Sequence, residues 1–509
     1  MPPSNRAAVI PPANTSSSRR RPRFGKGGGS YESLVDALVA ERGLTDGFDD
    51  SANAEAKKAA ANFGGNDRRK DYRDTPFVTI DDDSARDFDD AVYCRKADND
   101  DAVLLVVAIA DVAAFVAPGG VLDNVAKLRG NSVYLPDRVL PMLPAALSEG
   151  ACSLRPGEDR FCLACEMEVL DGMVRDYCFR RGIMRSAQRL NYQNASKMMR
   201  SGELALFAEM TAAFRRRRRD NGGLMIERPE TKVRLQNETL HREETRRDIA
   251  HWAIEECMIA ANQCAADFLV RRRVPALHRV HKKPADAGMR KLAGVLRQMA
   301  IPFPSRPVAA DFGYALDIAD SRSPSLGAAL TPVILGALGR AAYSPDDESG
   351  HYGLACERYT HFTSPIRRYP DLITHRALLK AMGDADGRIT ADLTQTGEYC
   401  SQTEHIADKM EWQIRQRLFC RAVQDDIGEV AEGYITGAAA FGLFVNAPKL
   451  RVEGMVPFSK LPGYWQFDEP SQSITSREGK TFSLGDKLNI RLDSVIAEKG
   501  KVNFSVVDC

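Results

Sequence analysis

The stretch Thr79-Ile80-Asp81-Asp82-Asp83-Ser84-Ala85-Arg86-Asp87-Phe88-Asp89-Asp90-Ala91-Val92 packs six aspartates into ten positions. Apolar, strand-like runs bracket the aspartates at residues 77–80 and 91–93. Carboxylates crowded in this way repel one another, so folding them together is costly unless a cation neutralises them. A solvated acidic turn is the alternative. The apolar flanks favour a buried site instead, and hard oxygen donors indicate Mg²⁺ or Mn²⁺ rather than zinc.

Size and composition set broad limits. A chain of 509 residues has room for two to four domains. Its 44% hydrophobic and 27% charged residues are typical of a soluble globular protein. The net charge of +1 does not by itself indicate a polyanionic partner, so any such preference has to come from local patches.

The first thirty residues are rich in Pro, Ser and Gly, carry six cations and contain no acidic residue. This composition predicts a disordered basic arm over residues 1–30. Such an arm could add phosphate contacts, act as a solubility tail or serve as a transit peptide. The cations are Arg6, Arg19, Arg20, Arg21, Arg23 and Lys26.

Targeting signals and cysteine usage suggest a reducing compartment. The sequence has no signal-peptide pattern and no apolar run of membrane length, so we expect a cytoplasmic protein without membrane contact. The eleven cysteines are scattered, as expected for reduced thiols. Cys162 and Cys165 form a C-x-x-C without a second pair at zinc spacing, and we expect both to lie in the core.

Periodicity predicts an α+β protein made of a large mixed α/β region and a small all-β barrel. Helices are expected at 31–43, 52–63, 186–219, 248–270, 371–382 and 398–426, and strands over 77–169. After Gly428 the pattern changes to five short strands with glycine turns, the size of an OB-fold. The predicted division is a basic arm (1–30), a short helical region (31–74), a large mixed α/β domain (75–385), a helical connection (386–427) and an OB-fold domain (428–509).

Aromatic residues gather around the C-terminal strands, with lysine and arginine between them. Phe441 and Phe444 are the main examples, and Phe458, Tyr464 and Trp465 follow. Rings on which bases stack, with cations along the backbone, are typical of single-stranded nucleic-acid binding. The alternative is that some of these rings are barrel core.

A second dense motif lies at His361-Phe362-Thr363-Ser364-Pro365-Ile366-Arg367-Arg368-Tyr369-Pro370-Asp371-Leu372. Two adjacent arginines after a proline-stiffened turn offer planar forks for a phosphate, or they could pair with the aspartates. Aspartates that hold a divalent metal, together with an arginine on the same substrate, indicate phosphodiester hydrolysis.

These two motifs also carry a resemblance to a known family. The pattern T-I-D-x5-D-x-D-D-A at 79–91 and the motif at 361–372 resemble the catalytic domain of the ribonuclease II / ribonuclease R family. The resemblance covers about residues 75–385, and residues 440–445 and 453–456 resemble the OB-fold RNA-binding domain of the ribosomal S-one type. Further agreeing segments lie at 109–112, 131–138, 141–144, 254–262 and 275–281.

The resemblance implies a processive, Mg²⁺-dependent 3′→5′ exoribonuclease (Mn²⁺ being possible) that releases nucleoside 5′-monophosphates from single-stranded RNA. The metal cluster it implies consists of Asp81, Asp87, Asp89 and Asp90, with Asp81 and Asp90 as direct ligands. Asp87 and Asp89 would be catalytic, Asp89 being the more critical, and Arg367 would contact the scissile phosphate.

The same resemblance implies RNA contacts outside the aspartates. Tyr134 would clamp the terminal base, and Tyr192 would help to set the length of the final product. A glutamate on the helix at 248–270 would contact the substrate, Glu256 or its neighbour Glu255. With Phe441 and Phe444 these residues complete the expected RNA-binding set, and we expect a monomer that needs no protein partner.

Three departures from the family pattern limit this expectation. Ala108 stands where the family has a histidine, and residues 224–226 offer no aromatic ring for the second side of the base clamp. Only about 75 residues precede Asp81, too few for the family's two cold-shock domains, so we expect a wider RNA entry path. The alternatives are a catalytically silent RNA-binding protein on the same scaffold, and a phosphodiesterase that acts on DNA or as an endonuclease.

Overall fold

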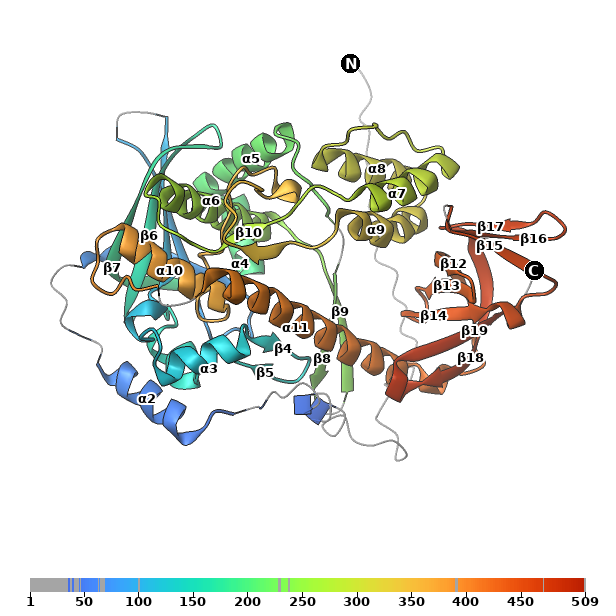
Figure 1. The fold of residues 1–509 in the computed structure, drawn as a ribbon, viewed down its shortest axis with the longest axis horizontal. Helices are drawn as coiled ribbons and strands as arrows, with labels where there is room; N and C mark the ends of the chain where they lie inside the picture. Colours follow the sequence, from blue (N-terminus) through green and yellow to red (C-terminus); the bar gives the residue numbers. More distant parts are fainter. Residues whose placement is uncertain are drawn as a thin grey trace, which may run out of the picture.

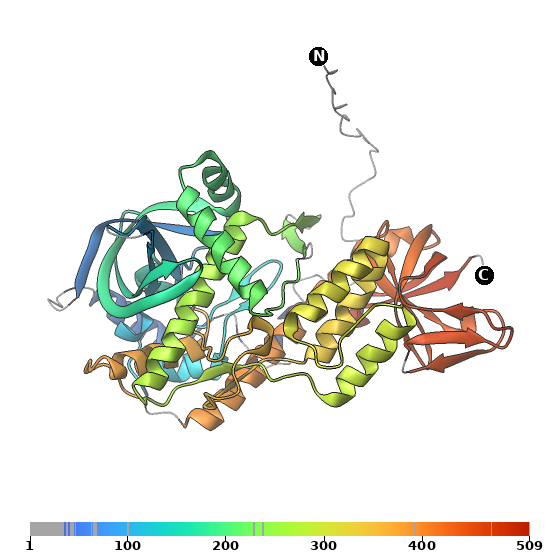
Figure 2. The same cartoon turned by 90° about the horizontal axis from the view of Figure 1, so that it is seen from above.

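The structure is a computed structural model that describes residues 35–36, 39–40, 45, 47–62, 64, 69–98, 101–227, 230–236, 239–389, 392–469 and 471–507. Within these residues the strands form two closed barrels, and helices and small two- and three-stranded sheets make up the rest. The barrels lie at opposite ends of the molecule (Figure 1), and the view from above shows the same separation (Figure 2). The predicted fold class, a mixed α/β region followed by a small all-β barrel, is confirmed.

The first barrel places the acidic stretch at a strand end. Strand β1 pairs antiparallel with β2 and parallel with β7, so the six aspartates fall at the end of β1, in the loop that follows and at the start of β2. The five strands, in the order in which they pair, are β1 (Lys70–Asp81), β2 (Asp90–Lys96), β3 (Val103–Ala110), β6 (Asp159–Leu170) and β7 (Met173–Asn191).

Helices cover this barrel because its strands are apolar on both faces. Alternate residues of β3 belong to different apolar clusters, with Val107 in one and Val106 in the other. Helix α6 packs on the barrel through small buried residues such as Ala253 and Cys257, which allow close approach. The covering helices are α3 (Val121–Arg129), α4 (Tyr192–Ser201), α5 (Ala205–Asp220), α6 (Ile249–Arg271) and α10 (Tyr369–Ala381).

The helix predicted at 186–219 is wrong at its start. Residues 186–191 end strand β7, and Leu190 pairs with Ile80 of β1. Asn191 then caps α4, its side-chain oxygen accepting the backbone N–H of Asn194 at 2.7 Å. Gly202, with φ of +102°, separates α4 from α5. Strand pairing across the barrel overrides the local helical pattern, a tertiary effect that periodicity does not register.

Three helices that the sequence did not predict lie between the two barrels in Figure 1. Their apolar cluster includes Phe312 and Leu330, and it reaches Leu484 and Tyr434 near the second barrel. These helices are α7 (Asp286–Gln298), α8 (Ala309–Arg322) and α9 (Pro324–Leu338). The smaller elements are α2 (Asp50–Ala61), β4 (Val133–Tyr134), β5 (Val139–Leu140), β8 (Glu230–Gln236), β9 (Thr239–Thr245), β10 (His278–Val280) and β11 (Ala342–Ser344).

A 30-residue helix, α11 (Leu393–Ala422), runs from the first barrel to the second (Figure 1). Within the segment predicted as a helix at 31–43, the described residues are helical, and Val35 and Val39 pack against α11. The remainder of that segment, and the predicted basic arm at 1–30, lie outside the described residues.

The second barrel contains the five strands predicted after Gly428. Two of the rings there differ sharply in burial: Trp465 stacks on Phe482 at 5.1 Å as core, whereas Phe441 is 59% exposed. The strands are β12 (Val430–Ala439), β13 (Gly442–Ala447), β14 (Val452–Pro457), β18 (Lys487–Ile496) and β19 (Lys501–Val506). A small sheet that was not predicted adds β15 (Trp465–Asp468), β16 (Ser473–Ser476) and β17 (Thr481–Phe482).

Two further sequence expectations can be compared with the fold. No helix in the described ranges is both long enough and apolar enough to cross a membrane. The ten cysteines in the described residues are free thiols, and Cys162 and Cys165 are fully buried in β6. The prediction that this C-x-x-C pair belongs to the core is therefore confirmed.

Candidate functional site

The aspartates singled out in the sequence converge where β1 ends and β2 begins. Asp81 is the last residue of β1, Asp90 is the first of β2, and Asp87 and Asp89 lie in the loop between the strands. Asp89 is only 4% exposed. The Oδ2 atom of Asp81 is buried and has no hydrogen-bond partner among the described residues, an unfavourable state for a carboxylate oxygen.

Burial and mutual repulsion disfavour the charged forms of these side chains. Burial, then the charges of Asp90 and Asp87, raise the pKa of Asp81 to about 8. Burial raises the pKa of Asp90 to about 6, although the Arg367 guanidinium opposes the shift. Burial likewise raises the pKa of Asp89 well above its usual range. A positive charge placed among these oxygens would reverse this penalty.

The aspartates suit a hard divalent cation for two reasons. Their carboxylate oxygens are the donors that such a cation prefers, and one oxygen of Asp81 has no partner among the described residues. In the described part of the chain, no group of three or more His, Cys, Asp or Glu side chains is arranged so as to hold a metal ion by itself. Water or substrate oxygens would therefore have to complete the coordination, as is usual for Mg²⁺.

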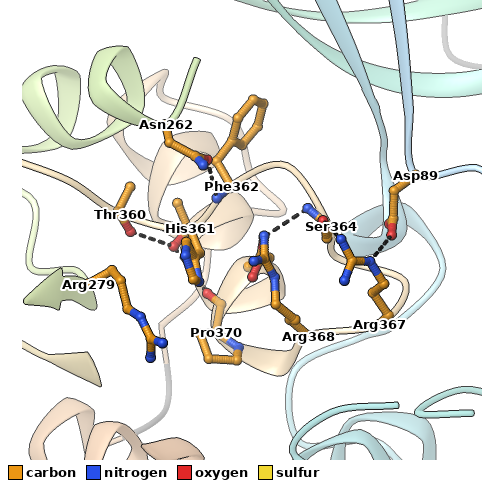
Figure 3. Close-up of polar contacts among 12 residues, drawn as sticks. Asp89, Asn262, Arg279, Thr360, His361, Phe362, Ser364, Arg367, Arg368 and Pro370 are labelled. Atoms are coloured by element: carbon orange, nitrogen blue, oxygen red, sulfur yellow. Dashed lines mark hydrogen bonds and ion pairs between the residues drawn. The ribbon is translucent and has the colours of Figure 1, made fainter. Parts of the chain in front are cut away.

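The two sequence motifs meet at Asp89. Its Oδ1 accepts the backbone N–H of Ile366 at 2.8 Å, and its Oδ2 lies 3.3 Å from Nε of Arg367 (Figure 3). A terminal nitrogen of Arg367 donates to Oγ of Ser364 at 2.9 Å. The Arg367 side chain stays partly exposed beside the aspartates, where a phosphate could reach it.

The second arginine of the motif serves the fold. Arg368 donates to Oδ1 of Asp371 at 2.7 Å, and the same oxygen accepts the backbone N–H of Ser364 at 2.8 Å. The Asn262 side chain, from α6, accepts the backbone N–H of Phe362 at 2.8 Å (Figure 3). These bonds fix the segment between α6 and α10, so Arg367 is the arginine left to face a ligand.

Tyr134 lies at the edge of the aspartate cluster. Its hydroxyl donates to Oδ2 of Asp87 at 3.1 Å, and its ring is 41% exposed. Its backbone N–H donates to Oε1 of Glu411, on α11, at 2.9 Å. The β4–β5 hairpin that carries it is tied to the arginine loop, because the N–H of Ser132 donates to the Arg367 carbonyl at 2.9 Å.

Tyr192 begins α4 and stacks on His251, with ring centroids 3.9 Å apart and planes within 9°. Burial, then the charges of Asp81 and Asp90, raise the pKa of Tyr192, so its hydroxyl lies within electrostatic reach of the cluster. Sequence reasoning did not single out His251. Its position four residues before Glu255 on the same helix face is the signal that could have identified it.

The two candidate glutamates have different surroundings. Glu256 is 3% exposed and binds Arg218 at 2.6 Å inside the protein. Glu255 is partly exposed and binds Arg247 at 2.6 Å. The sequence left the choice between them open. Glu255 is the better placed of the two for a ligand, because Glu256 is buried against Arg218, which reaches Glu255 only at 3.5 Å.

The remaining positions singled out in the sequence are on the second barrel, in β3 next to Asp90, and on a small cavity. Phe441 and Phe444 form an exposed edge-to-face pair on the second barrel, with ring centroids 6.1 Å apart. Ala108 is fully buried in β3. Residues 224–226 line a small cavity with aliphatic side chains.

The two barrels, the acidic loop and the arginine that meets it define a class of protein that comparisons with known families identify. Residues 69–384 match the RNB domain family, and the chain therefore belongs to that family. Among curated relatives, Ribonuclease R of Escherichia coli (strain K12) is 36% identical over 471 residues. That match covers 86% of this chain and 57% of the relative, so the chain spans little more than half of the relative's length.

Solved structures share the fold at lower sequence identity. Mycoplasma genitalium RNase R in complex with ribose methylated single-stranded RNA superposes with a TM-score of 0.87 at 23% identity, over 94% of this chain and 78% of that chain. Yeast Ssd1, a pseudonuclease, superposes with a TM-score of 0.70 at 18% identity, over 88% of this chain and 58% of that chain.

Proposed function

We propose that this protein is a Mg²⁺-dependent 3′→5′ exoribonuclease that hydrolyses single-stranded RNA to nucleoside 5′-monophosphates. The observation that carries the proposal is the contact of the partly exposed Arg367 with the buried Asp89 at 3.3 Å, beside the half-buried Asp81, Asp87 and Asp90. This contact combines a cation for the phosphate with carboxylates for a metal. Membership of the RNB domain family and the name of the Escherichia coli relative, Ribonuclease R, support the same activity.

Asp81, Asp87, Asp89 and Asp90 are the residues that would hold the cation, directly or through water. When bound, Mg²⁺ would neutralise charge on the phosphate and lower the pKa of an attacking water. Mn²⁺ has the same preference for oxygen ligands and could replace it. In the absence of a cation, the raised pKa of Asp81 favours its protonated form.

Arg367 would bind the non-bridging oxygens of the scissile phosphate through its planar fork, where charge grows in the transition state. Asp89 holds that guanidinium from one side and Ser364 from another, so the fork is oriented before substrate arrives. Such preorganisation stabilises the transition state without a cost of reorientation during the reaction.

The rings near the cluster would hold the end of the strand. Tyr134 offers a partly exposed face beside Asp87. Tyr192 directly follows β7, the strand that pairs with β1, and stacks on His251. Stacking is indifferent to base identity, which suits degradation without sequence preference. Phe441 and Phe444 on the second barrel would bind the strand further upstream, and contacts to the 2′-hydroxyl would select RNA over DNA.

We further propose that the protein acts as a monomer in the cytoplasm, without a required protein partner. The free thiols of the described cysteines fit a reducing compartment.

The test is a time course with a 5′-labelled single-stranded oligoribonucleotide and Mg²⁺. We expect a ladder of shortening products and the release of 5′-monophosphates, with a circular RNA left intact and the matched DNA cut more slowly. Cleavage of the circle would show endonuclease action, and equal rates on DNA would show a broader phosphodiesterase; either result would contradict the proposal.

A second candidate function is RNA binding without catalysis. The fold is shared with yeast Ssd1, a pseudonuclease, so the scaffold alone does not require activity. A gel shift of the RNA without shortening in either Mg²⁺ or Mn²⁺ would favour this function. The four clustered aspartates and the oriented Arg367 favour the exoribonuclease.

A further inference from the structure

The acidic loop between β1 and β2 is held by residues that lie outside it. Asp81 and Asp90 belong to paired strands, and the backbone N–H of Ile366 fixes the side chain of Asp89. Asp87, by contrast, lies within the loop. The position of its carboxylate therefore depends on what holds the peptide groups on either side of its Cα atom.

One buried hydroxyl, that of Ser153, bonds both of these peptide groups. Its Oγ accepts the backbone N–H of Phe88 at 3.0 Å and donates to the backbone carbonyl of Arg86 at 2.7 Å. Ser153 is fully buried, in the segment that precedes β6. The N–H of the next residue, Leu154, donates to the Phe88 carbonyl at 3.0 Å. Three hydrogen bonds from this segment thus fix the backbone before and after Asp87.

The first half of the loop is held by Arg189, on β7. One terminal nitrogen of its guanidinium donates to the carbonyls of Asp82 at 3.1 Å and Asp83 at 2.8 Å. The guanidinium carbon lies 5.0 Å from the centroid of the Phe88 ring, which is buried. Because one side chain contacts two carbonyls and an aromatic face, Arg189 constrains the path of the chain from Asp82 to Phe88.

These contacts matter for a metal because the carboxylates of the loop repel one another. A loop that is free to move would spread its charges apart, and a cation would have to gather them again on binding. The bonds from Ser153 and Arg189 meet that cost during folding instead, so the donors are oriented before the cation arrives. Groups that orient metal ligands typically contribute about 10–100-fold in metal affinity.

We infer that Ser153 and Arg189 are positioning residues for the divalent cation. Neither is a ligand; both act by holding Asp87 and its loop in the arrangement that binds the metal. The inference rests on the proposed function in one respect, that a divalent cation binds at the aspartates.

Arg189 also carries a charge, whose effect on a metal is opposite in sign to the effect of its loop contacts. A positive charge beside the aspartates repels a cation, so removing it would strengthen metal binding if charge were its main role. Removing the loop contacts would weaken metal binding. The direction of the change therefore distinguishes the two roles. Ser153 is neutral, so its replacement tests the hydrogen bonds alone.

The experiment measures binding of Mn²⁺, which prefers the same oxygen ligands, to the full chain without RNA, from the EPR signal of the free ion. We expect Ser153→Ala and Arg189→Met each to raise the dissociation constant for Mn²⁺ about tenfold. Arg185→Met is the matched control for charge, since Arg185 is an exposed arginine of the same strand that pairs with Asp159. Ser505→Ala is the control for a buried hydroxyl, in the second barrel. Both controls should bind Mn²⁺ as the parent does.

Thermal melts of the metal-free proteins separate positioning from a general loss of stability. Ser153 is buried, so Ser153→Ala is expected to lower the melting temperature, whereas Arg189 is exposed and provides a variant with an intact core. A lower melting temperature with unchanged Mn²⁺ affinity would show that a residue is merely structural. Unchanged or tighter Mn²⁺ binding in either variant would overturn the inference.

Failure of the proposed function would give a different pattern. A parent that binds Mn²⁺ but leaves RNA intact would refute the exoribonuclease, while weaker Mn²⁺ binding in the two variants would still confirm the positioning roles. A parent that shortens RNA, with Mn²⁺ affinity unchanged in both variants, would refute only the inference about Ser153 and Arg189. A parent that binds no Mn²⁺ would also refute that inference.

Discussion

The Oδ1 atom of Asp89 accepts the backbone N–H of Ile366 at 2.8 Å, although 277 positions separate the two residues in the sequence. The bond fixes Asp89 and orients the residue after Ile366, Arg367, toward the same carboxylate. The acidic loop and the arginine loop are therefore one unit, and a change on either side is expected to affect both.

Asp89→Asn should abolish RNA shortening and preserve the fold. Burial raises the pKa of Asp89 well above its usual range, so without a cation the neutral form of this carboxyl is favoured. Replacing it with a neutral amide should therefore not destabilise the metal-free protein. We expect turnover to fall by at least about a hundredfold, while the melting temperature in EDTA stays equal or rises. Single-turnover assays and thermal melts measure the two effects. Retained turnover would remove Asp89 from the chemistry.

Arg367 and Arg368 should separate catalysis from stability. Arg367→Ala removes the partly exposed fork, and we expect kcat/KM to fall about a hundredfold or more with little change in melting temperature. Arg368→Ala leaves the fully buried Asp371 without its charged partner, which should cost about 3–5 kcal/mol of unfolding free energy. Urea unfolding and initial rates, measured on both variants, check the contrast. Equal effects of the two substitutions on stability would contradict it.

The aspartate cluster predicts a pH dependence that Mg²⁺ removes. The pKa of Asp81 is raised to about 8 in the folded protein and is about 3.9 in an unfolded chain. Between these values the folded state holds the extra proton, so the unfolding free energy of the metal-free protein falls as pH rises through this window. Thermal melts in EDTA at pH 5.5, 7 and 8.5 should show this fall, relative to Asp81→Asn as control.

Mg²⁺ needs the ionised carboxylates, so its stabilising effect should grow as the pH rises over the same window. The Mg²⁺ concentration that gives half-maximal activity should therefore be lower at pH 8.5 than at pH 6.5. A requirement that does not change with pH would show that Asp81 does not titrate in the way its surroundings indicate.

Tyr134 should act through its ring more than through its hydroxyl. Tyr134→Ala removes the exposed face beside Asp87 and should weaken binding of a short oligoribonucleotide by about 1–3 kcal/mol. Tyr134→Phe loses only the 3.1 Å hydrogen bond to Asp87 and should bind nearly as well as the parent. Dissociation constants in the Asp89→Asn background provide the measurement. A loss of equal size in both variants would assign the role to the hydroxyl.

The pair Phe441 and Phe444 should contribute affinity rather than chemistry. Replacing both with alanine should weaken binding of a long single strand by about 2–6 kcal/mol at most, given about 1–3 kcal/mol for each stacked base. The single-turnover rate at saturating protein should not change. Val430→Ala, an exposed apolar residue on β12 of the same barrel, is the control. A slower single-turnover rate would place the pair in the reaction itself.

Local patterns in the sequence were enough to predict many of the helices and strands and the position of the aspartate cluster. The aspartates lie within one strand–loop–strand unit, so their spacing alone indicated that they would converge. Helices such as α6 and strands such as β12 follow regular apolar patterns and were predicted within a few residues. Phe441 and Phe444 were singled out as candidate RNA contacts, but composition could not tell which rings of the second barrel are exposed and which, like Trp465, are core.

What the sequence could not provide depends on contacts between distant segments. Residues 186–191 become a strand because β1 lies beside them, and no local pattern reports that neighbour. Arg367 and Arg368 are chemically identical neighbours. The resemblance pointed to Arg367, and the position of Asp371 gives the physical reason, since it binds Arg368. Glu255 and Glu256 differ in burial and in the additional contact of Glu255 with Arg247, and both differences depend on distant segments. The small cavity lined by residues 224–226 is likewise formed by segments that lie far apart along the chain.

Helix α11 is one unbroken rod of 30 residues, which at 1.5 Å per residue is about 45 Å long. Glu411 fixes it to the Tyr134 hairpin, and its far end packs on the second barrel. The distance between the two barrels is therefore set by a rigid helix and not by a flexible linker. On the proposed function, an RNA long enough to contact both barrels would be bound at two places. A shorter RNA would contact one barrel only and would dissociate sooner.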